Sequence, residues 1–362
     1  MAGKGWGFYA HGCTVMQPSF FDPAGRGPGA ARILEALDPS LGDGDFGALA
    51  LALLRQQAET NVPYRRLLRA QGFETGAAAC WSDFPAMPAS SFKDVSVCTF
   101  PESEAVAVFE TSGTTSGRPG RHYFRSLVYY EKALEAAWRQ FLPDLSGHHW
   151  VSLIPPAAVK KTSSLSHMIS HLSGRVAGGR TVWCCDGDYR MDLELFRREL
   201  EKNDRPVLVL GTSFALAQAA ESGCATGLPA GSVIFDSGGY KGRQREIPKD
   251  EFMSLLGETF GVPASGIWNE YGMTEWSSQG YARGDTGLHG FPPWMRIVLR
   301  DPESGAEVAP GETGLVEAYD LANVGSVMAV GTRDLARWES GGLRILGRLA
   351  AGDARGCSLS YE

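Results

Sequence analysis

The stretch TSGTTSGRP, at residues 111–119, decides how the rest of this chain is interpreted. It follows a predicted buried strand and precedes a predicted helix. Its glycines let a ligand approach the backbone closely, and its hydroxyls and unpaired amides offer donors to phosphate oxygens. A flexible Ser/Gly linker has a similar composition, but six fixed positions arise by chance with a probability on the order of 10⁻⁷ per start. We therefore predict an oxyanion-binding loop made of Thr111, Ser112, Gly113, Thr114, Thr115, Ser116 and Gly117.

Strands and helices alternate on both sides of this loop. Helical stretches such as 127–141 and 192–202 separate apolar runs at 104–110, 150–154, 181–183, 207–210 and 232–235. This alternation predicts an α/β fold, with a mostly parallel sheet covered by helices. Beyond Gly290, the runs 295–299 and 313–319 flank turn residues and predict antiparallel hairpins.

These patterns divide the chain into four predicted segments. Leucines at helical spacing between residues 33 and 70 indicate helices near the N-terminus. The predicted segments are a helical N-terminal cap (1–104), an α/β nucleotide-binding core (105–290), a small β-rich subdomain (291–345) and a hinge-like C-terminal arm (346–362).

Composition and charge exclude several classes of protein. The formal net charge of -7 comes from scattered acids, and without a Lys/Arg run we expect no nucleic-acid partner. The 7 cysteines form no Cys-x-x-Cys pair, so they indicate neither a zinc site nor a disulfide scaffold and favour a reducing compartment. We find no secretory signal pattern and no apolar run long enough for a bilayer. We therefore expect a cytoplasmic protein that does not insert into membranes.

Two motifs in order resemble the acyl-adenylate-forming superfamily. A strand followed by (T/S)SGTTGxP is similar to its phosphate loop, although Ser116 stands where glycine is usual. NEYGMTE, at 269–275, resembles its YGxTE motif. The resemblance implies that Tyr271 packs near adenine, Thr274 contacts the α-phosphate and Glu275 holds magnesium, a cation that prefers carboxylate oxygens. Otherwise Tyr271 and Met273 would be core residues and Glu275 a solvated charge. The nucleotide-binding residues implied here also include Asn269, Glu270, Gly272 and Met273.

Two further segments extend this resemblance. DSGGYKG, at 236–242, resembles the adenine-side glycine pair and implies contacts from Ser237, Gly238, Gly239 and Tyr240. Lys241 either places its ammonium on a carboxylate or phosphate, or is an exposed lysine at a turn. In GTRD, at 331–334, Arg333 departs from the usual TGD. The resemblance implies that Asp334 accepts hydrogen bonds from both ribose hydroxyls, and the alternative is a surface ion pair with a neighbouring arginine.

The end of the chain resembles one subgroup. LGR, at 346–348, is similar to the hinge whose Arg348 precedes a C-terminal domain of roughly a hundred residues in the superfamily, and here only 14 residues follow. We therefore expect the full C-terminal swivelling domain to be absent, as in the acyl-protein synthetases of bacterial fatty-acid reductases. In that subgroup a cysteine near the C-terminus accepts the acyl group, and Cys357 matches its position. The alternative is a structural cysteine or a terminal segment without a role.

His167 and His171 lie four residues apart and would share a helix face, which suggests a metal pair, although the sequence shows no third ligand. In the superfamily a His or aromatic residue after the phosphate loop shapes the carboxylate pocket. His167 is a candidate for this position, against the alternative of a hydrogen-bonded structural histidine.

The sequence therefore predicts ATP- and Mg²⁺-dependent activation of a carboxylic acid to an acyl-adenylate. A thiol would then take the acyl group: Cys357, coenzyme A or a carrier protein, with an acyl-CoA or acyl-protein reductase as a further partner. One alternative is a coenzyme A ligase similar to the phenylacetate-CoA ligases. The other is a catalytically idle relative that binds nucleotide.

Overall fold

A computed structural model of the chain describes residues 21–111, 118–202, 205–223, 227–238 and 247–349. Within these ranges the α-helices are α1 (Gly27–Ala36), α2 (Asp43–Thr60), α3 (Val62–Ala70), α4 (Val128–Phe141), α5 (Ser164–Arg175), α6 (Leu193–Glu201), α7 (Ser213–Glu221) and α8 (Lys249–Phe260). None of these helices is both long and apolar enough to cross a bilayer.

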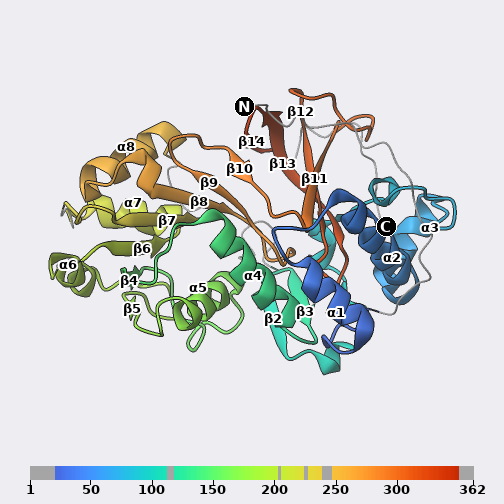
Figure 1. The fold of residues 1–362 in the computed structure, drawn as a ribbon, viewed down its shortest axis with the longest axis horizontal. Helices are drawn as coiled ribbons and strands as arrows, with labels where there is room; N and C mark the ends of the chain where they lie inside the picture. Colours follow the sequence, from blue (N-terminus) through green and yellow to red (C-terminus); the bar gives the residue numbers. More distant parts are fainter. Residues whose placement is uncertain (1–20, 112–117, 203–204, 224–226, 239–246, 350–362) are drawn as a thin grey trace.

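The strands form one large sheet and one small one (Figure 1). Described in chain order, they are β1 (Met87–Pro88), β2 (Ala107–Glu110), β3 (Arg121–Phe124), β4 (His149–Ser152), β5 (Val182–Trp183), β6 (Val207–Gly211), β7 (Val233–Ser237), β8 (Ile267–Tyr271), β9 (Gly280–Arg283), β10 (His289–Gly290), β11 (Met295–Arg300), β12 (Thr313–Asp320), β13 (Ala329–Glu339) and β14 (Gly342–Arg348). The large sheet has the order β11-β12-β13-β14-β10-β9-β8-β7-β6-β4-β5, and β1 pairs with β13.

The parallel part of the large sheet runs through β5, β4, β6, β7 and β8. Successive side chains of a strand face opposite sides, so both faces must be covered. Leu208 and Leu210 of β6 join one apolar cluster with α4 and α5, whereas Val207 and Val209 join a second cluster with α6, α7 and α8. The predicted helix-covered α/β fold is confirmed.

The other half of the large sheet is antiparallel from β8 through β9, β10, β14, β13, β12 and β11. Its β11 and β12 confirm the hairpin predicted after Gly290. Backbone pairing continues across the predicted boundary at 290/291, because β10 pairs with β9 on one side and β14 on the other. The limits of the four segments stay a prediction.

One local prediction is wrong. The alternation of strands and helices places the run at 104–110 in the parallel sheet. Instead β2 pairs antiparallel with β3 in a separate two-stranded sheet, and the predicted helix follows β3 as α4. The segment RHYF of β3 is short and half polar, so its apolar pattern was too weak to indicate a strand.

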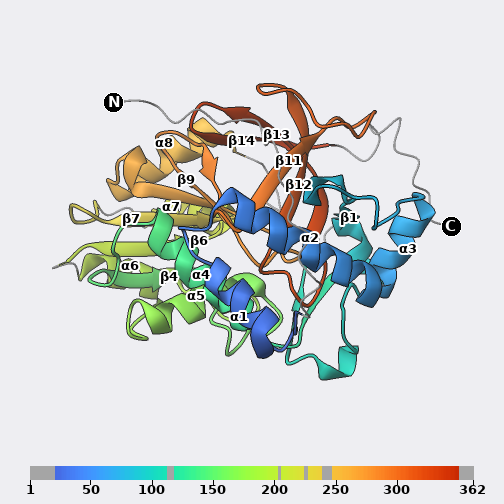
Figure 2. The same cartoon turned by 45° about the vertical axis from the view of Figure 1, so that its right-hand side comes forward.

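Buried amides attach helix α2 to the loop after β12. Figure 2 shows α2 running across the front of the molecule beside α1. The Gln57 side chain is fully buried, and its Nε2 donates to the Asn323 carbonyl at 2.8 Å while its Oε1 accepts from the Met328 amide at 2.8 Å. Asn61 Nδ2 donates to the Ser326 carbonyl at 3.1 Å. The N-terminal helices are therefore bound to the sheet by specific hydrogen bonds as well as by apolar packing.

We expect Gln57→Ala to lower the free energy of unfolding by about 2–6 kcal/mol, because it leaves a buried N–H and a buried C=O unpaired at about 1–3 kcal/mol each. Urea unfolding followed by circular dichroism measures this loss. The matched control is Gln71→Ala, whose side chain is exposed. Equal stability of the two variants would contradict the role given to Gln57.

Candidate functional site

Adjacent parallel strands bring two of the predicted motifs together, DSGGYKG at 236–242 and NEYGMTE at 269–275. β7 ends at Ser237 and β8 ends at Tyr271, and Ser237 lies opposite Glu270 in the register. The Ser237 hydroxyl donates a hydrogen bond to the Glu270 carboxylate, and both side chains are buried. Because the carboxyl ends of parallel strands meet at one edge, this edge is where ligands of α/β sheets usually bind.

A second group joins Tyr271 to the antiparallel half of the sheet. Asp334 of β13 lies opposite Arg348 of β14 in the register. The Tyr271 hydroxyl donates to Asp334 Oδ2 at 2.8 Å, and Arg348 Nε donates to Asp334 Oδ1 at 2.7 Å. Three residues predicted from separate motifs thus meet at one carboxylate.

The environment fixes the charge states in this group. Burial, followed by the nearby Asp334 carboxylate, raises the pKa of Tyr271 well above its ordinary value, so the phenol keeps its proton and donates. The hydrogen bond to Asp334 raises the pKa of Arg348, and Glu275 adds to this effect through its negative charge. Asp334 does not pair with Arg337, whose guanidinium binds Glu339 at 2.8 Å.

Two side chains that are distant in the sequence hold the backbone of the Thr274–Glu275 turn. His122 Nδ1 lies 2.8 Å from the Thr274 carbonyl oxygen, and Asn323 Nδ2 donates to the Glu275 carbonyl at 2.9 Å. Since a carbonyl only accepts, Nδ1 carries the proton of the His122 ring. The Glu275 residue itself is 5% exposed.

His122 is buried and neutral. Burial lowers its pKa to about 4, despite the opposing effect of its hydrogen bond to Thr274. Sequence analysis missed both His122 and Asn323, because each acts on a segment distant in the chain and lies in no motif. The one signal for His122 is its place on the strand that leaves the glycine-rich loop.

A chain of buried and partly buried polar groups surrounds Asp236. Ser213 Oγ and Asn269 Nδ2 each donate to the Asp236 carboxylate at 2.7 Å. His289 Nε2 lies 2.8 Å from Asn269 Oδ1 and donates to it. Burial raises the pKa of Asp236 to about 7, although both hydrogen bonds act in the opposite direction. The Asn269 amide, predicted to contact nucleotide, is therefore engaged at both ends within the protein.

Gly272 has a steric reason to be glycine. A Cβ at this position would lie 2.2 Å from Glu270 Oε1 and 3.0 Å from Gln279 Cγ. A side chain at this position would therefore force the buried Glu270 carboxylate to move. Met273 packs against the main apolar cluster.

Several predicted site residues lie outside the described residues. They are Ser112, Gly113, Thr114, Thr115, Ser116, Gly117, Gly239, Tyr240, Lys241 and Cys357. At the base of the glycine-rich loop, Thr111 Oγ1 accepts from the Gly120 amide at 2.8 Å, and the Thr111 amide donates to the Gly120 carbonyl at 2.9 Å. These two bonds continue the β2–β3 pairing into the loop. Gly238 directly follows β7, and its carbonyl lies close to the Ser213 hydroxyl, whose single proton is shared between this carbonyl and the Asp236 carboxylate.

His167 lies at a different place, between α4 and α5. Its Nε2 is 3.1 Å from Glu131 Oε1, and its ring packs against Phe109 with centroids 5.4 Å apart. A role in a carboxylate pocket stays a prediction. The His167–Glu131 contact matches the alternative of a hydrogen-bonded histidine.

Comparison with known proteins gives a result for the fold only. No family model matches the chain, and no curated protein matches its sequence. Among solved structures, 2-hydroxyisobutyryl-CoA ligase in the postadenylation state matches with a TM-score of 0.65 and 15% identity, over 92% of this chain and 74% of the ligase. The same ligase in an open conformation, with 2-HIB-AMP and CoA, matches with a TM-score of 0.61 and 15% identity, over 91% of this chain and 81% of the ligase. The chain shares the fold of this ligase.

ATP-bound MatB from Rhodopseudomonas palustris also matches, with a TM-score of 0.51 and 17% identity over 69% of this chain. The chain spans about half the length of that protein, at 49%.

We expect His122 to make stability depend on pH. Its folded pKa of about 4 lies below the ordinary 6.5, so the unfolded chain binds the proton first and stability is lost as pH falls from 6.5 towards 4. The reference is His122→Asn, whose side chain offers an N–H donor but does not titrate. Relative to this variant, the free energy of unfolding of the wild type should fall by roughly 2–3 kcal/mol between about pH 7 and about pH 4.5.

The measurement is the free energy of unfolding of both proteins in urea across this range. The two free energies must be subtracted because other buried groups titrate in the same range. Burial raises the pKa of Asp236 to about 7 and that of Asp320 to about 6, so these carboxyls increase stability as pH falls. A pH-independent difference would show that His122 titrates normally.

Proposed function

We propose that this chain uses ATP and Mg²⁺ to activate a carboxylic acid as its acyl-adenylate. The observation that carries the proposal is the meeting of Tyr271, Asp334 and Arg348 at one carboxylate, next to the Thr274–Glu275 turn. The shared fold adds support, because the solved structures of that fold include an ATP-bound protein and a ligase with 2-HIB-AMP and CoA.

The ribose fits the Asp334 carboxylate in its chemistry. Each carboxylate oxygen has two lone-pair directions, and Tyr271 and Arg348 use one direction on each oxygen. One acceptor position per oxygen remains, which suits the two neighbouring hydroxyls of a ribose. Tyr271 and Arg348 also fix the orientation of the carboxylate, so little side-chain entropy is lost when the sugar binds.

In the first step an oxygen of the substrate carboxylate attacks the α-phosphorus of ATP. The bond from that phosphorus to the bridging oxygen breaks, and pyrophosphate leaves with the electron pair. Thr274 would contact the α-phosphate, at a position fixed through its carbonyl by His122. Glu275 supplies buried carboxylate oxygens, the donors that magnesium prefers, and would hold the ion that neutralises phosphate charge.

In the second step a thiolate attacks the acyl carbon, a thioester bond forms, and AMP leaves. The proposed acceptors are Cys357, coenzyme A and the phosphopantetheine of a carrier protein, with a reductase as the next enzyme. A coenzyme A ligase is the second candidate, since the ligase that shares the fold was crystallised with CoA.

We expect pyrophosphate exchange into ATP to require a carboxylic acid. Glu275→Gln should lower the exchange rate by ~10²–10³, the typical loss when a group that stabilises transition-state charge is removed. The matched control is Glu303→Gln, because Glu303 is an exposed glutamate in a surface turn. Exchange assays with a panel of aliphatic and aromatic acids would measure this. Exchange that no acid stimulates would favour the idle relative.

We expect the acyl acceptor to be revealed by labelling. If Cys357 accepts, a radiolabelled acid with ATP and magnesium should label the protein, neutral hydroxylamine should remove the label, and Cys357→Ser should abolish it while Cys80→Ser does not. Label-free protein that forms acyl-adenylate and releases an acyl-CoA when coenzyme A is added would identify the ligase alternative instead.

A further inference from the structure

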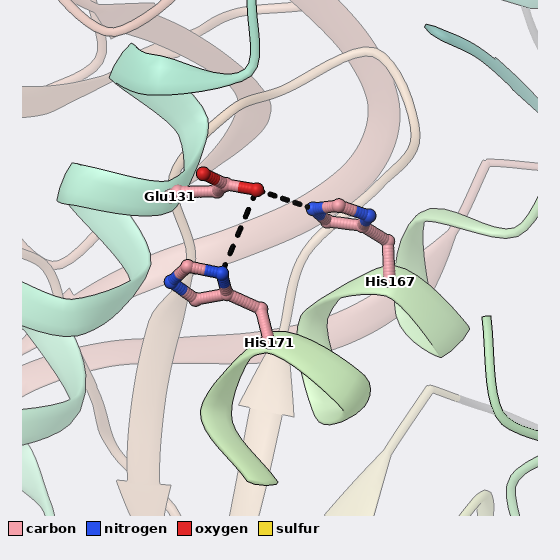
Figure 3. Close-up of side chains that lie close together, drawn as sticks. All are labelled: Glu131, His167 and His171. Carbon is pink, nitrogen blue, oxygen red and sulfur yellow. Dashed lines mark hydrogen bonds and ion pairs between the residues drawn. The ribbon is translucent and has the colours of Figure 1, made fainter. Parts of the chain in front are cut away.

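The interface of α4 and α5 gathers two imidazoles and a carboxylate (Figure 3). His167 and His171 are four residues apart on α5, so their side chains leave the same face of the helix. Glu131, on the facing helix α4, points between the two rings. The structure thus places a carboxylate beside the histidine pair, a neighbour that the sequence alone does not reveal.

The three candidate ligand atoms lie near the spacing that a metal ion requires. His167 Nε2 lies 3.1 Å from Glu131 Oε1, and His171 Nδ1 lies 3.5 Å from the same oxygen. All three ligand atoms lie within 4.8 Å of one another. Ligands held about 2.0–2.1 Å from a tetrahedral zinc ion are about 3.3–3.4 Å apart, so only small side-chain movements are needed to close the site.

Glu135 orients one of the imidazoles. His171 Nε2 lies 3.0 Å from Glu135 Oε1, which leaves Nδ1 directed at Glu131. Arg175 and Arg139 hold the Glu135 carboxylate at 2.9 Å and 2.6 Å. A carboxylate that accepts from the second N–H of a metal-binding histidine is the usual support of such ligands, since it fixes the tautomer and increases the basicity of the ring.

We propose that Glu131, His167 and His171 form a binding site for a zinc ion or a similar divalent transition metal. Two imidazoles and one carboxylate are a common set of three protein ligands for zinc, with a fourth position left for water or another ligand. The side chains are 33%, 20% and 15% exposed, so an ion can enter from solvent. The site differs from the one proposed at Glu275, because magnesium prefers oxygen ligands alone.

The proposed metal site lies next to the strand that leads into the glycine-rich loop. The His167 ring packs against Phe109 of β2 and Tyr130 of α4, with centroids 5.4 Å and 5.8 Å apart. A bound ion would therefore link α4 to α5, and β2 packs against one of its ligands. Since β2 leads directly into Thr111, the metal would stiffen the base of the glycine-rich loop.

The test uses full-length protein without a polyhistidine tag, treated with chelator and then dialysed. Titration calorimetry with Zn²⁺ should show one ion per chain, and heating scans should show a higher Tm with Zn²⁺. His171→Ala should weaken binding at least about 100-fold because it removes a ligand, and Glu135→Gln about 10–100-fold because it removes the support. The matched control is His148→Ala, a partly exposed histidine that contacts the Gly231 carbonyl, and it should bind like wild type.

Co²⁺ serves as an optical probe of the ligands. Weak visible bands without thiolate charge-transfer absorption are expected, and they should disappear in His171→Ala. Thiolate absorption would show that cysteines bind the metal. Equal Zn²⁺ affinity of wild type and His171→Ala would show that the cluster is only an ion-pair network. Either result overturns the proposal. Circular dichroism of each variant separates lost ligands from lost folding. Acid-dependent pyrophosphate exchange is measured on the same samples, so failure of the metal site and failure of the proposed activity remain distinct.

Discussion

The carboxylate of Asp334, held between the Tyr271 hydroxyl and the Arg348 guanidinium, is the interaction on which the candidate site depends. It joins the last residue of a parallel strand to two antiparallel strands, so both halves of the large sheet must be in place before it can form. Tyr271 can donate because burial keeps its pKa well above its ordinary value. The hydrogen bond that links the two halves of the sheet therefore also orients the group proposed to receive a ribose.

Around this carboxylate, the turn that carries Glu275 is held by buried polar side chains. His122 and Asn323 bind its carbonyls, and Gln57 in turn binds the carbonyl of Asn323. Each of these groups lost water on folding, and each would be costly if left unpaired. The N-terminal helices thus contribute to the geometry of a turn more than two hundred residues away in the chain.

The sequence predicted what depends on local pattern. The apolar runs predicted as strands are β4, β6 and β7, and they alternate with helices as expected. The motifs around Tyr271 and Asp334 are neighbours in the structure. It could not predict contacts between distant, weakly patterned segments. The β3 strand is short and half polar, and His122 is one histidine among 7. Likewise Glu131 became recognisable as a partner of His167 and His171 only when α4 and α5 were packed together.

The central claim is that Asp334 recognises a ribose. The most direct test compares the affinity of ATP with those of its 2′-deoxy and 3′-deoxy analogues, for wild type and Asp334→Asn, with thermal unfolding as a check on folding. Removing either hydroxyl should weaken binding to the wild type by about tenfold or more, the value of a hydrogen bond to a charged group, and should have much less effect in the variant. Equal affinities for the three nucleotides in the wild type, or the same discrimination in Asp334→Asn, would contradict the account.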